Sequence, residues 1–188
     1  MAAKTTARKT ARKTAMKTMM TAVKAKQRKA PELSREQIDE VVTLIKDAGS
    51  VEIKLVVPMP SHRATLAKLG VDPIECEVRQ VYFFDTPDLD LNKAGVVVRA
   101  RRIQGGAGDT VVKLRPVDPA AIDRELRRSA SFKTEIDVVP GGFVCSGSFK
   151  GNCTAQEAKD AVGGKIPLDA LFSKEQRAFY SKHAPKGV

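Results

Sequence analysis

Cysteine, histidine and long apolar runs are scarce in this chain, and each scarcity excludes a class of protein. The three cysteines, Cys76, Cys145 and Cys153, are odd in number and widely spaced, which fits neither a disulfide framework nor paired zinc ligands. The chain has no run of 18 apolar residues for a transmembrane segment, and its basic N-terminus lacks the apolar region of a secretory signal peptide. We therefore expect a soluble, cytoplasmic protein with free thiols.

Residues for nucleophilic or histidine-based chemistry are equally few. His62 and His183 each stand without a carboxylate or second histidine at ligand spacing, so we interpret both as surface residues. No Cys-His-Asp pattern surrounds the cysteines, and Cys76 lies in a segment that we expect to be a packed strand. The glycine-rich residues 104–109 contain no Lys-Ser/Thr pair and open no helix, which predicts a hairpin loop rather than a phosphate-binding P-loop.

Acidic residues are absent from the first thirty positions, which hold ten Lys or Arg residues. Residues 31–188 have 23 basic and 22 acidic residues, so the net charge of +11 comes almost wholly from the N-terminus. The small-basic-Thr repeat of residues 4–17 predicts a disordered tail over residues 1–31, although apolar residues within 16–23 would allow a helix against a partner. Two interpretations stay open: residues 1–30 bind nucleic acid or another polyanion, or they only add solubility.

Residues 32–188 predict one α+β domain. Capping residues and helical periodicity predict helices at 33–49, 62–69, 120–128, 154–162 and 173–183. Alternating patterns predict five strands, at 50–57, 75–86, 95–103, 110–117 and 131–139. We expect an antiparallel sheet, because most of these strands follow one another through short connections, and we expect a loop over the glycine-rich residues 140–152.

Charged residues recur at every second position of several predicted strands. Because successive side chains of a strand point to opposite faces, each set forms a row with a spacing of about 6.5 Å. The rows are Glu52 with Lys54, Arg99 with Arg101, Lys113 with Arg115, and Lys133 with Glu135 and Asp137. A solvated sheet face explains any single row. Together, the rows also fit a sheet that curls into a complete or incomplete tunnel-like barrel with a charged interior and flanking helices outside.

A restricted channel of this composition suits a polyphosphate. Arginine and lysine neutralise phosphate oxygens, and carboxylates hold Mg²⁺ or Mn²⁺ through oxygen ligands. The candidate metal ligands are Glu52, Glu135 and Asp137. The candidate phosphate-binding residues are Lys54, Arg99, Arg101, Lys113, Arg115 and Lys133, of which Lys54, Arg99 and Arg101 are also candidate catalytic residues.

The order of motifs from about residue 50 to residue 139 is recognisable. "VYFFDTPDLDLNKAGVVVRARR" is similar to a strand, a "YFDTPDL" turn and an "L-x-x-R-x-R" strand, and "VVKLRP" follows in place of a "T-x-K" strand. In this order the chain resembles the CYTH, or triphosphate tunnel metalloenzyme, superfamily. That superfamily includes inorganic triphosphatases, thiamine triphosphatases, RNA 5′-triphosphatases and class IV adenylate cyclases, and its members bind triphosphate and divalent metal in an eight-stranded tunnel.

The resemblance implies roles for residues of this sequence. By motif, Glu52 and Lys54 match the second Glu and the Lys of the family's "E-x-E-x-K" strand, Arg99 and Arg101 its arginines, Lys113 its lysine, and Glu135 with Asp137 its acidic pair. Ser50 stands where the first glutamate would be, which removes one expected metal ligand. Five strands fall short of the family's tunnel. A shortened variant, strands hidden in 141–151, or a second subunit in a homodimer are the alternatives.

Two classes of function follow from these patterns. The first is metal-dependent hydrolysis of a triphosphate or a nucleoside triphosphate, which we favour over adenylate cyclase action because no adenine-pocket signature is present. The second is a catalytically weak polyphosphate or nucleic-acid binding module, in which the basic tail adds avidity.

Overall fold

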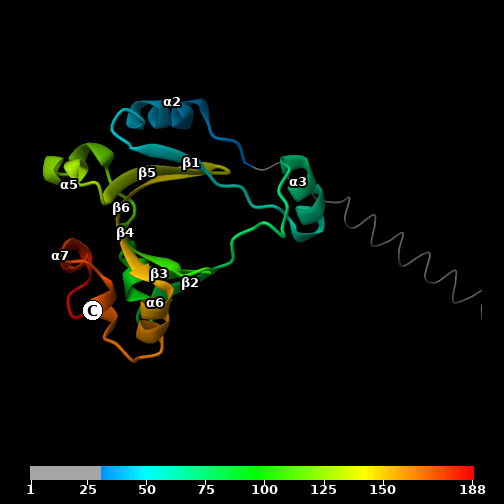
Figure 1. Cartoon of the computed structure of the whole chain (residues 1–188). Coiled ribbons are helices and arrows are strands. Elements are labelled where there is room, and N and C mark those ends of the chain that lie inside the picture. The colour runs from blue at the N-terminus through cyan, green and yellow to red at the C-terminus, as the bar shows by residue number, and fades with distance from the viewer. Residues whose placement is uncertain (1–30) are drawn as a thin grey trace, which may run out of the picture. The chain divides into compact units, whose positions relative to one another are not determined.

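Residues 31–188 fold around one mixed sheet, in the strand order β1-β5-β6-β4-β3-β2 (Figure 1). These are the residues that the computed structural model describes, and Leu33–Val188 form one compact unit. The strands are β1 (Ser50–Ile53), β2 (Arg79–Phe84), β3 (Val96–Ile103), β4 (Ala107–Leu114), β5 (Phe132–Val139) and β6 (Gly142–Thr154). The predictions of a disordered tail, a conditional helix and a polyanion site within residues 1–30 lie outside the described residues.

Neighbouring strands of this sheet are antiparallel except where β1 lies beside β5 in parallel. The predicted antiparallel sheet is therefore wrong for β1, because β1 and β5 are far apart in sequence and no hairpin sets their relative direction. The sheet bends but does not close into a barrel, since β1 and β2 remain its two edges.

The sequence patterns predict a loop over residues 140–152, but most of these residues belong to strand β6. Its glycines give the segment the composition of a loop, yet they are needed for packing inside a strand. A Cβ at Gly147 would lie 2.9 Å from the ring of Phe132, and one at Gly151 would lie 2.6 Å from the side-chain oxygen of Gln176. One strand is therefore hidden in 141–151, as one of the three alternatives has it, but the sheet has only six strands.

Two other predicted strands are shorter in the structure. Strand β1 ends at Ile53, opposite Val138, where its partner β5 is about to end. Strand β2 begins only at Arg79, opposite Ile103, because the residues before it run past the end of β3. Cys76 therefore lies outside any strand and is exposed, so the expectation of a packed cysteine there is wrong.

The helices begin largely where the capping residues indicate. They are α2 (Arg35–Leu44), α3 (His62–Leu69), α4 (Asp90–Lys93), α5 (Arg124–Arg128), α6 (Ala155–Val162) and α7 (Lys174–His183), with 3-10 turns η1 (Met59–Ser61), η2 (Pro119–Ala121) and η3 (Leu168–Leu171). Capping boxes close the N-termini of α2, α6 and α7. The helix predicted at 120–128 is divided between η2 and α5. None of the helices in the described part of the chain is long and apolar enough to span a bilayer.

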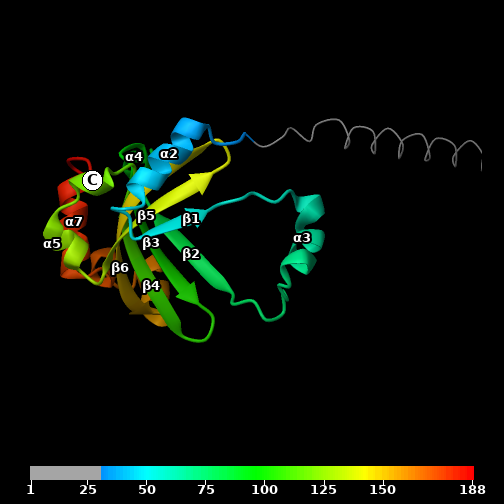
Figure 2. The ribbon, with the colours of Figure 1, turned by 90° about the horizontal axis from the view of Figure 1, so that it is seen from above.

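Helices α6 and α7 pack on the apolar face of the sheet and build the main core (Figure 1). Phe132 and Phe149 stack with Phe179 of α7, with ring centroids 5.0–5.8 Å apart. A smaller cluster under α2 contains Val41, Ile136 and Cys145. These helices leave the other, charged face of the strands uncovered, whereas α3 stands apart on a long connection between β1 and β2 (Figure 2).

Gln176 links α7 to the two central strands, and we predict that its loss destabilises the fold. The fully buried amide donates to the carbonyl oxygens of Thr110 and Phe149, at 3.2 Å each, and its oxygen accepts from the Thr110 hydroxyl. Gln176→Leu leaves buried carbonyl groups without a donor, so the free energy of unfolding should fall by roughly 2–4 kcal/mol in urea titrations. Gln156→Leu, the same change on the exposed face of α6, should stay within about 0.5 kcal/mol; equal effects would contradict the assignment.

Candidate functional site

The strand register gathers polar side chains of five strands on one face of the sheet. Across β1 and β5, Ser50 is opposite Glu135 and Glu52 is opposite Asp137. Ser148 of β6 lies between Lys133 of β5 and Lys113 of β4. Further along, Lys150, Val111 and Arg99 form one row across β6, β4 and β3, and Asp109 is opposite Arg101. Residues that are distant in sequence therefore become neighbours.

A cavity of about 560 Å³ opens on this face. It is lined by Ser50, Val51, Glu52, Lys54, Val97, Arg99, Arg101, Val111, Lys113, Glu135, Ser148 and Lys150. Six of the residues predicted from sequence are therefore brought together, and Asp137 joins them through its ion pairs. Two predicted phosphate-binding residues, Arg115 and Lys133, are exposed and do not line the cavity.

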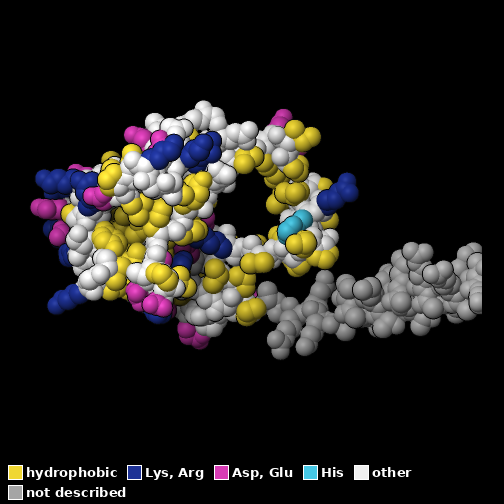
Figure 3. Space-filling view, turned by 90° about the horizontal axis from the view of Figure 1, so that it is seen from below, with side chains coloured by type: hydrophobic (Ala, Val, Ile, Leu, Met, Phe, Trp, Pro, Cys, Tyr) yellow, Lys and Arg dark blue, Asp and Glu magenta, His cyan; other side chains and the backbone are white. Residues whose placement is uncertain are grey.

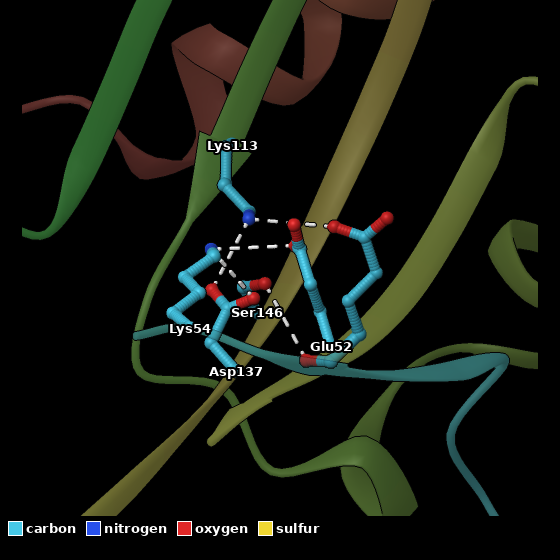
Figure 4. A network of polar contacts seen from close by, with 6 residues as sticks. Glu52, Lys54, Lys113, Asp137 and Ser146 are labelled. Atoms are coloured by element: carbon cyan, nitrogen blue, oxygen red, sulfur yellow. Dashed lines mark hydrogen bonds and ion pairs between the residues drawn. The ribbon is translucent and has the colours of Figure 1, made fainter. Parts of the chain in front are cut away.

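Asp137 lies at the centre of a network of charges (Figure 4). Its side chain is 3% exposed; the Nζ atom of Lys54 lies 2.8 Å from Oδ1, and that of Lys113 lies 3.5 Å from Oδ2. Lys113 also reaches Glu135 at 3.4 Å, and Lys54 reaches Glu52 at 3.4 Å. Each lysine thus joins two carboxylates.

These contacts shift the pKa of both partners in the closest pair. Burial alone would raise the pKa of Asp137, but the two lysine ammonium groups outweigh it and hold that pKa below its usual value. Burial alone would lower the pKa of Lys54, but Asp137 and Glu52 raise it instead. Asp137 and Lys54 are therefore both charged at neutral pH.

The three carboxylates fit a hard divalent cation. One oxygen each from Glu52, Glu135 and Asp137 lie within 4.8 Å of one another. Oxygen-only ligands are those that Mg²⁺ and Mn²⁺ prefer. Three negative carboxylates against two lysines leave the cluster with a net charge of −1, so a cation would be attracted, although it would have to displace lysine ammonium groups from the carboxylate oxygens.

The two arginines of β3 have different surroundings. The guanidinium of Arg101 donates from Nε to both carboxylate oxygens of Asp109 at 2.9 Å, and from a terminal nitrogen to Oδ2. This hydrogen bonding raises the pKa of Arg101. In contrast, the buried Nε of Arg99 has no hydrogen-bond partner among the described residues, and desolvation and the neighbouring Arg101 lower the pKa of Arg99.

Ser148 adds a second unpartnered group to the same cavity. Its side chain is 1% exposed, and its Oγ atom has no hydrogen-bond partner within residues 31–188. Buried donors without partners are rare in native proteins, and a ligand or water normally satisfies them. Arg99 and Ser148, with the Lys150 ammonium nearby along β6, therefore form a suitable place for an anion.

Two cavity residues, Ser148 and Lys150, and the partner of Arg101, Asp109, escape the sequence patterns. The sequence places Asp109 in a hairpin loop, although it alternates with Val111 and Lys113 once β4 begins at Ala107. Ser148 and Lys150 lie on β6, where polar residues also alternate with residues of the apolar face. This alternation of polar and apolar residues indicates a strand, but the glycines between them give the segment the composition of a loop.

No family model matches this chain, and comparisons with curated proteins and with solved structures likewise found no match. The resemblance of its motifs to the triphosphate tunnel metalloenzymes thus remains a hypothesis, and the function has to be argued from the geometry.

We predict that Asp137→Asn destabilises the protein, because among the described residues Asp137 alone pairs with both Lys54 and Lys113. The free energy of unfolding at neutral pH should fall by roughly 2–3 kcal/mol, less than for a fully buried pair because Lys54 is half-exposed. Glu52→Gln, at the exposed end of the network, serves as the matched control and should cost under about 1 kcal/mol.

The difference between the native protein and Asp137→Asn should depend on pH. Because the pKa of Asp137 is lowered by folding, its stabilising effect is fully present above the unfolded-state pKa of about 3.9 and is lost as the pH falls through the lower native value. Urea titrations from pH 7 down to pH 3 should show the two stabilities converging. A constant difference would mean that Asp137 acts through packing rather than charge.

Proposed function

We propose that this protein hydrolyses a triphosphate or nucleoside triphosphate with the help of a divalent metal ion. The observation that carries the proposal is that Glu52 and Glu135 line one cavity, with Asp137 clustered beside them, together with two donors that lack a partner among residues 31–188, Arg99 Nε and Ser148 Oγ. A magnesium–triphosphate complex carries both kinds of charge and needs both kinds of ligand. The motif resemblance to the triphosphate tunnel metalloenzymes supports the same reaction.

The proposed roles follow from position. Glu52, Glu135 and Asp137 would hold Mg²⁺ or Mn²⁺, which when bound polarises phosphoryl oxygens and lowers the pKa of a coordinated water. Arg99, Ser148 and Lys150 bind the phosphate oxygens on the other side of the cavity. Lys54 and Lys113, released from the carboxylates when the metal binds, neutralise the charge that develops on the transferring phosphoryl group.

Arg101 has a positioning role in this scheme. Its guanidinium is held by Asp109, so it contributes a fixed positive potential beside Arg99 and keeps that side chain from pairing with Asp109. We include in the proposal that the bent sheet acts as an incomplete form of the family's tunnel. Its charged face is the one that the helices α6 and α7 leave free (Figure 1).

One observation favours a second candidate, binding of polyphosphate without turnover. Lys54 and Lys113 already pair with the carboxylates, and Ser50 supplies no charge opposite Glu135. A protein of this kind would hold polyphosphate equally well in the presence of a chelator, whereas the enzyme needs the metal.

Phosphate release from triphosphate, ATP and polyphosphate tests the proposal directly. We expect release from at least one substrate with Mg²⁺ or Mn²⁺ and none with EDTA. Arg99→Ala should lower kcat/KM by about 100- to 1,000-fold, because a preorganised donor to the reacting phosphate is lost. Arg102→Ala, the neighbouring residue on the opposite face of β3, is the matched control and should retain activity.

Two results would count against hydrolysis. No release in a folded sample, with polyphosphate bound equally in EDTA, would leave the binding candidate. Equal losses in the Arg99 and Arg102 variants would place the reaction away from this cavity.

Ser50 offers a gain-of-function prediction. Because Ser50 is opposite Glu135 and lines the cavity, Ser50→Glu adds a fourth carboxylate to the cluster and should tighten Mn²⁺ binding about tenfold in calorimetry, as ligand charge does at other oxygen sites. Ser50→Gln adds the same length without the charge and should leave the affinity near that of the native chain. Similar affinities for the Glu and Gln variants would show that the cluster does not take the metal.

A further inference from the structure

The connection between β1 and β2 is a projecting arm, defined here as residues 55–78. It contains η1 and α3 and joins the two edges of the sheet (Figure 2). No residue of α3 is buried, and only Val57, Thr65 and Leu66 of the arm are even partly covered. An isolated helix of eight residues is not stable in water, so this arm needs a surface to pack against.

The exposed arm is unusually apolar. Ile74, Val56 and Met59 are 92%, 91% and 82% exposed. Four further large apolar residues are exposed on the arm: Leu55, Leu69, Val71 and Val78. Figure 3 shows apolar side chains along the arm and an opening between it and the rest of the domain. A contiguous apolar surface of this kind marks an interaction site rather than a solvated loop.

Charge along the arm changes sign once. Residues 58–70 contain the basic residues Arg63 and Lys68 and no acid, whereas residues 71–78 contain Asp72, Glu75 and Glu77 and no base. Glu77 is already paired with Arg79. The two basic residues in the first half are therefore matched in number by two acidic residues in the second half. Two such arms placed antiparallel would bring the basic half of each against the acidic half of the other.

We propose that the arms of two copies of this chain pair antiparallel about a two-fold axis. The basic half of each arm lies against the acidic half of the other, and the apolar side chains are buried between them, as in an isologous interface. These seven exposed apolar residues would supply a large part of the roughly 800 Å² that each partner buries in a standard stable interface.

The charge pattern disfavours other partners for the arm. A nucleic acid or an anionic membrane surface would attract the half with Arg63 and Lys68 but repel the half with Asp72 and Glu75. Only a partner with the reverse order of charges satisfies both halves, and a second copy supplies that order without a further component.

Mixing two charge variants of the full chain tests the pairing. Arg63→Glu with Lys68→Glu makes both halves of the arm acidic, and Asp72→Asn with Glu75→Lys removes two negative charges and adds a positive one. The asparagine keeps a side-chain oxygen for the Ile74 amide, which now donates to Asp72 at 2.8 Å. We expect the native chain to be a dimer by light scattering. Each variant alone should dissociate at least tenfold more readily, and an equimolar mixture should recover a heterodimer.

Controls separate this outcome from unfolding and from other interfaces. All four substituted residues are exposed, so circular dichroism and the melting temperature of the monomeric variants should match those of the native chain, apart from the contribution of dimerisation. Ile74→Asp should also yield a folded monomer. A native chain that is monomeric at concentrations on the order of 0.1 mM, a dimer that survives both charge variants, or a mixture that stays monomeric would overturn the proposal.

Discussion

The interaction on which the charged face of this sheet depends is the placement of Asp137 between Lys54 and Lys113. A carboxylate that is 3% exposed is tolerated only when it is neutralised. Lys54 directly follows β1, which lies beside β5, and Lys113 comes from β4, which β6 separates from β5. Strand β1 is short and lies at an edge, so the Lys54–Asp137 pair at its end adds a tie between β1 and the centre of the sheet. The same pairing keeps three carboxylates close enough together to share a cation.

The two faces of the sheet impose different requirements on the same strands. On one face, Val98, Val112 and Phe149 need helices to cover them, and α6 and α7 do so. On the other, the residues that alternate with them need counter-charges or ligands. Several find counter-charges within the sheet, but the Nε atom of Arg99 and the Oγ atom of Ser148 have no hydrogen-bond partner among residues 31–188. Both of these residues line the same cavity.

Much of this arrangement could be predicted from sequence, because alternation in a strand depends only on local geometry. It placed Glu52, Arg99, Lys113 and Glu135 on one face, and capping boxes located the helices. The features that could not be predicted from sequence depend on contacts between residues that are far apart in the chain. The glycines of β6 suit a strand only because Phe132 and Gln176 approach them, and the parallel direction of β1 is set by its pairing with β5.

The two arginines of β3 show why a motif alone does not assign roles. Arg99 and Arg101 are two residues apart on one face, so any pattern based on spacing treats them alike. Their partners across β4 differ, since Arg101 is opposite Asp109 and Arg99 is opposite the buried Val111. A carboxylate satisfies the first guanidinium, while an apolar side chain offers the second nothing. The register between two strands therefore determines which arginine is held by a carboxylate and which keeps a nitrogen without a partner among the described residues.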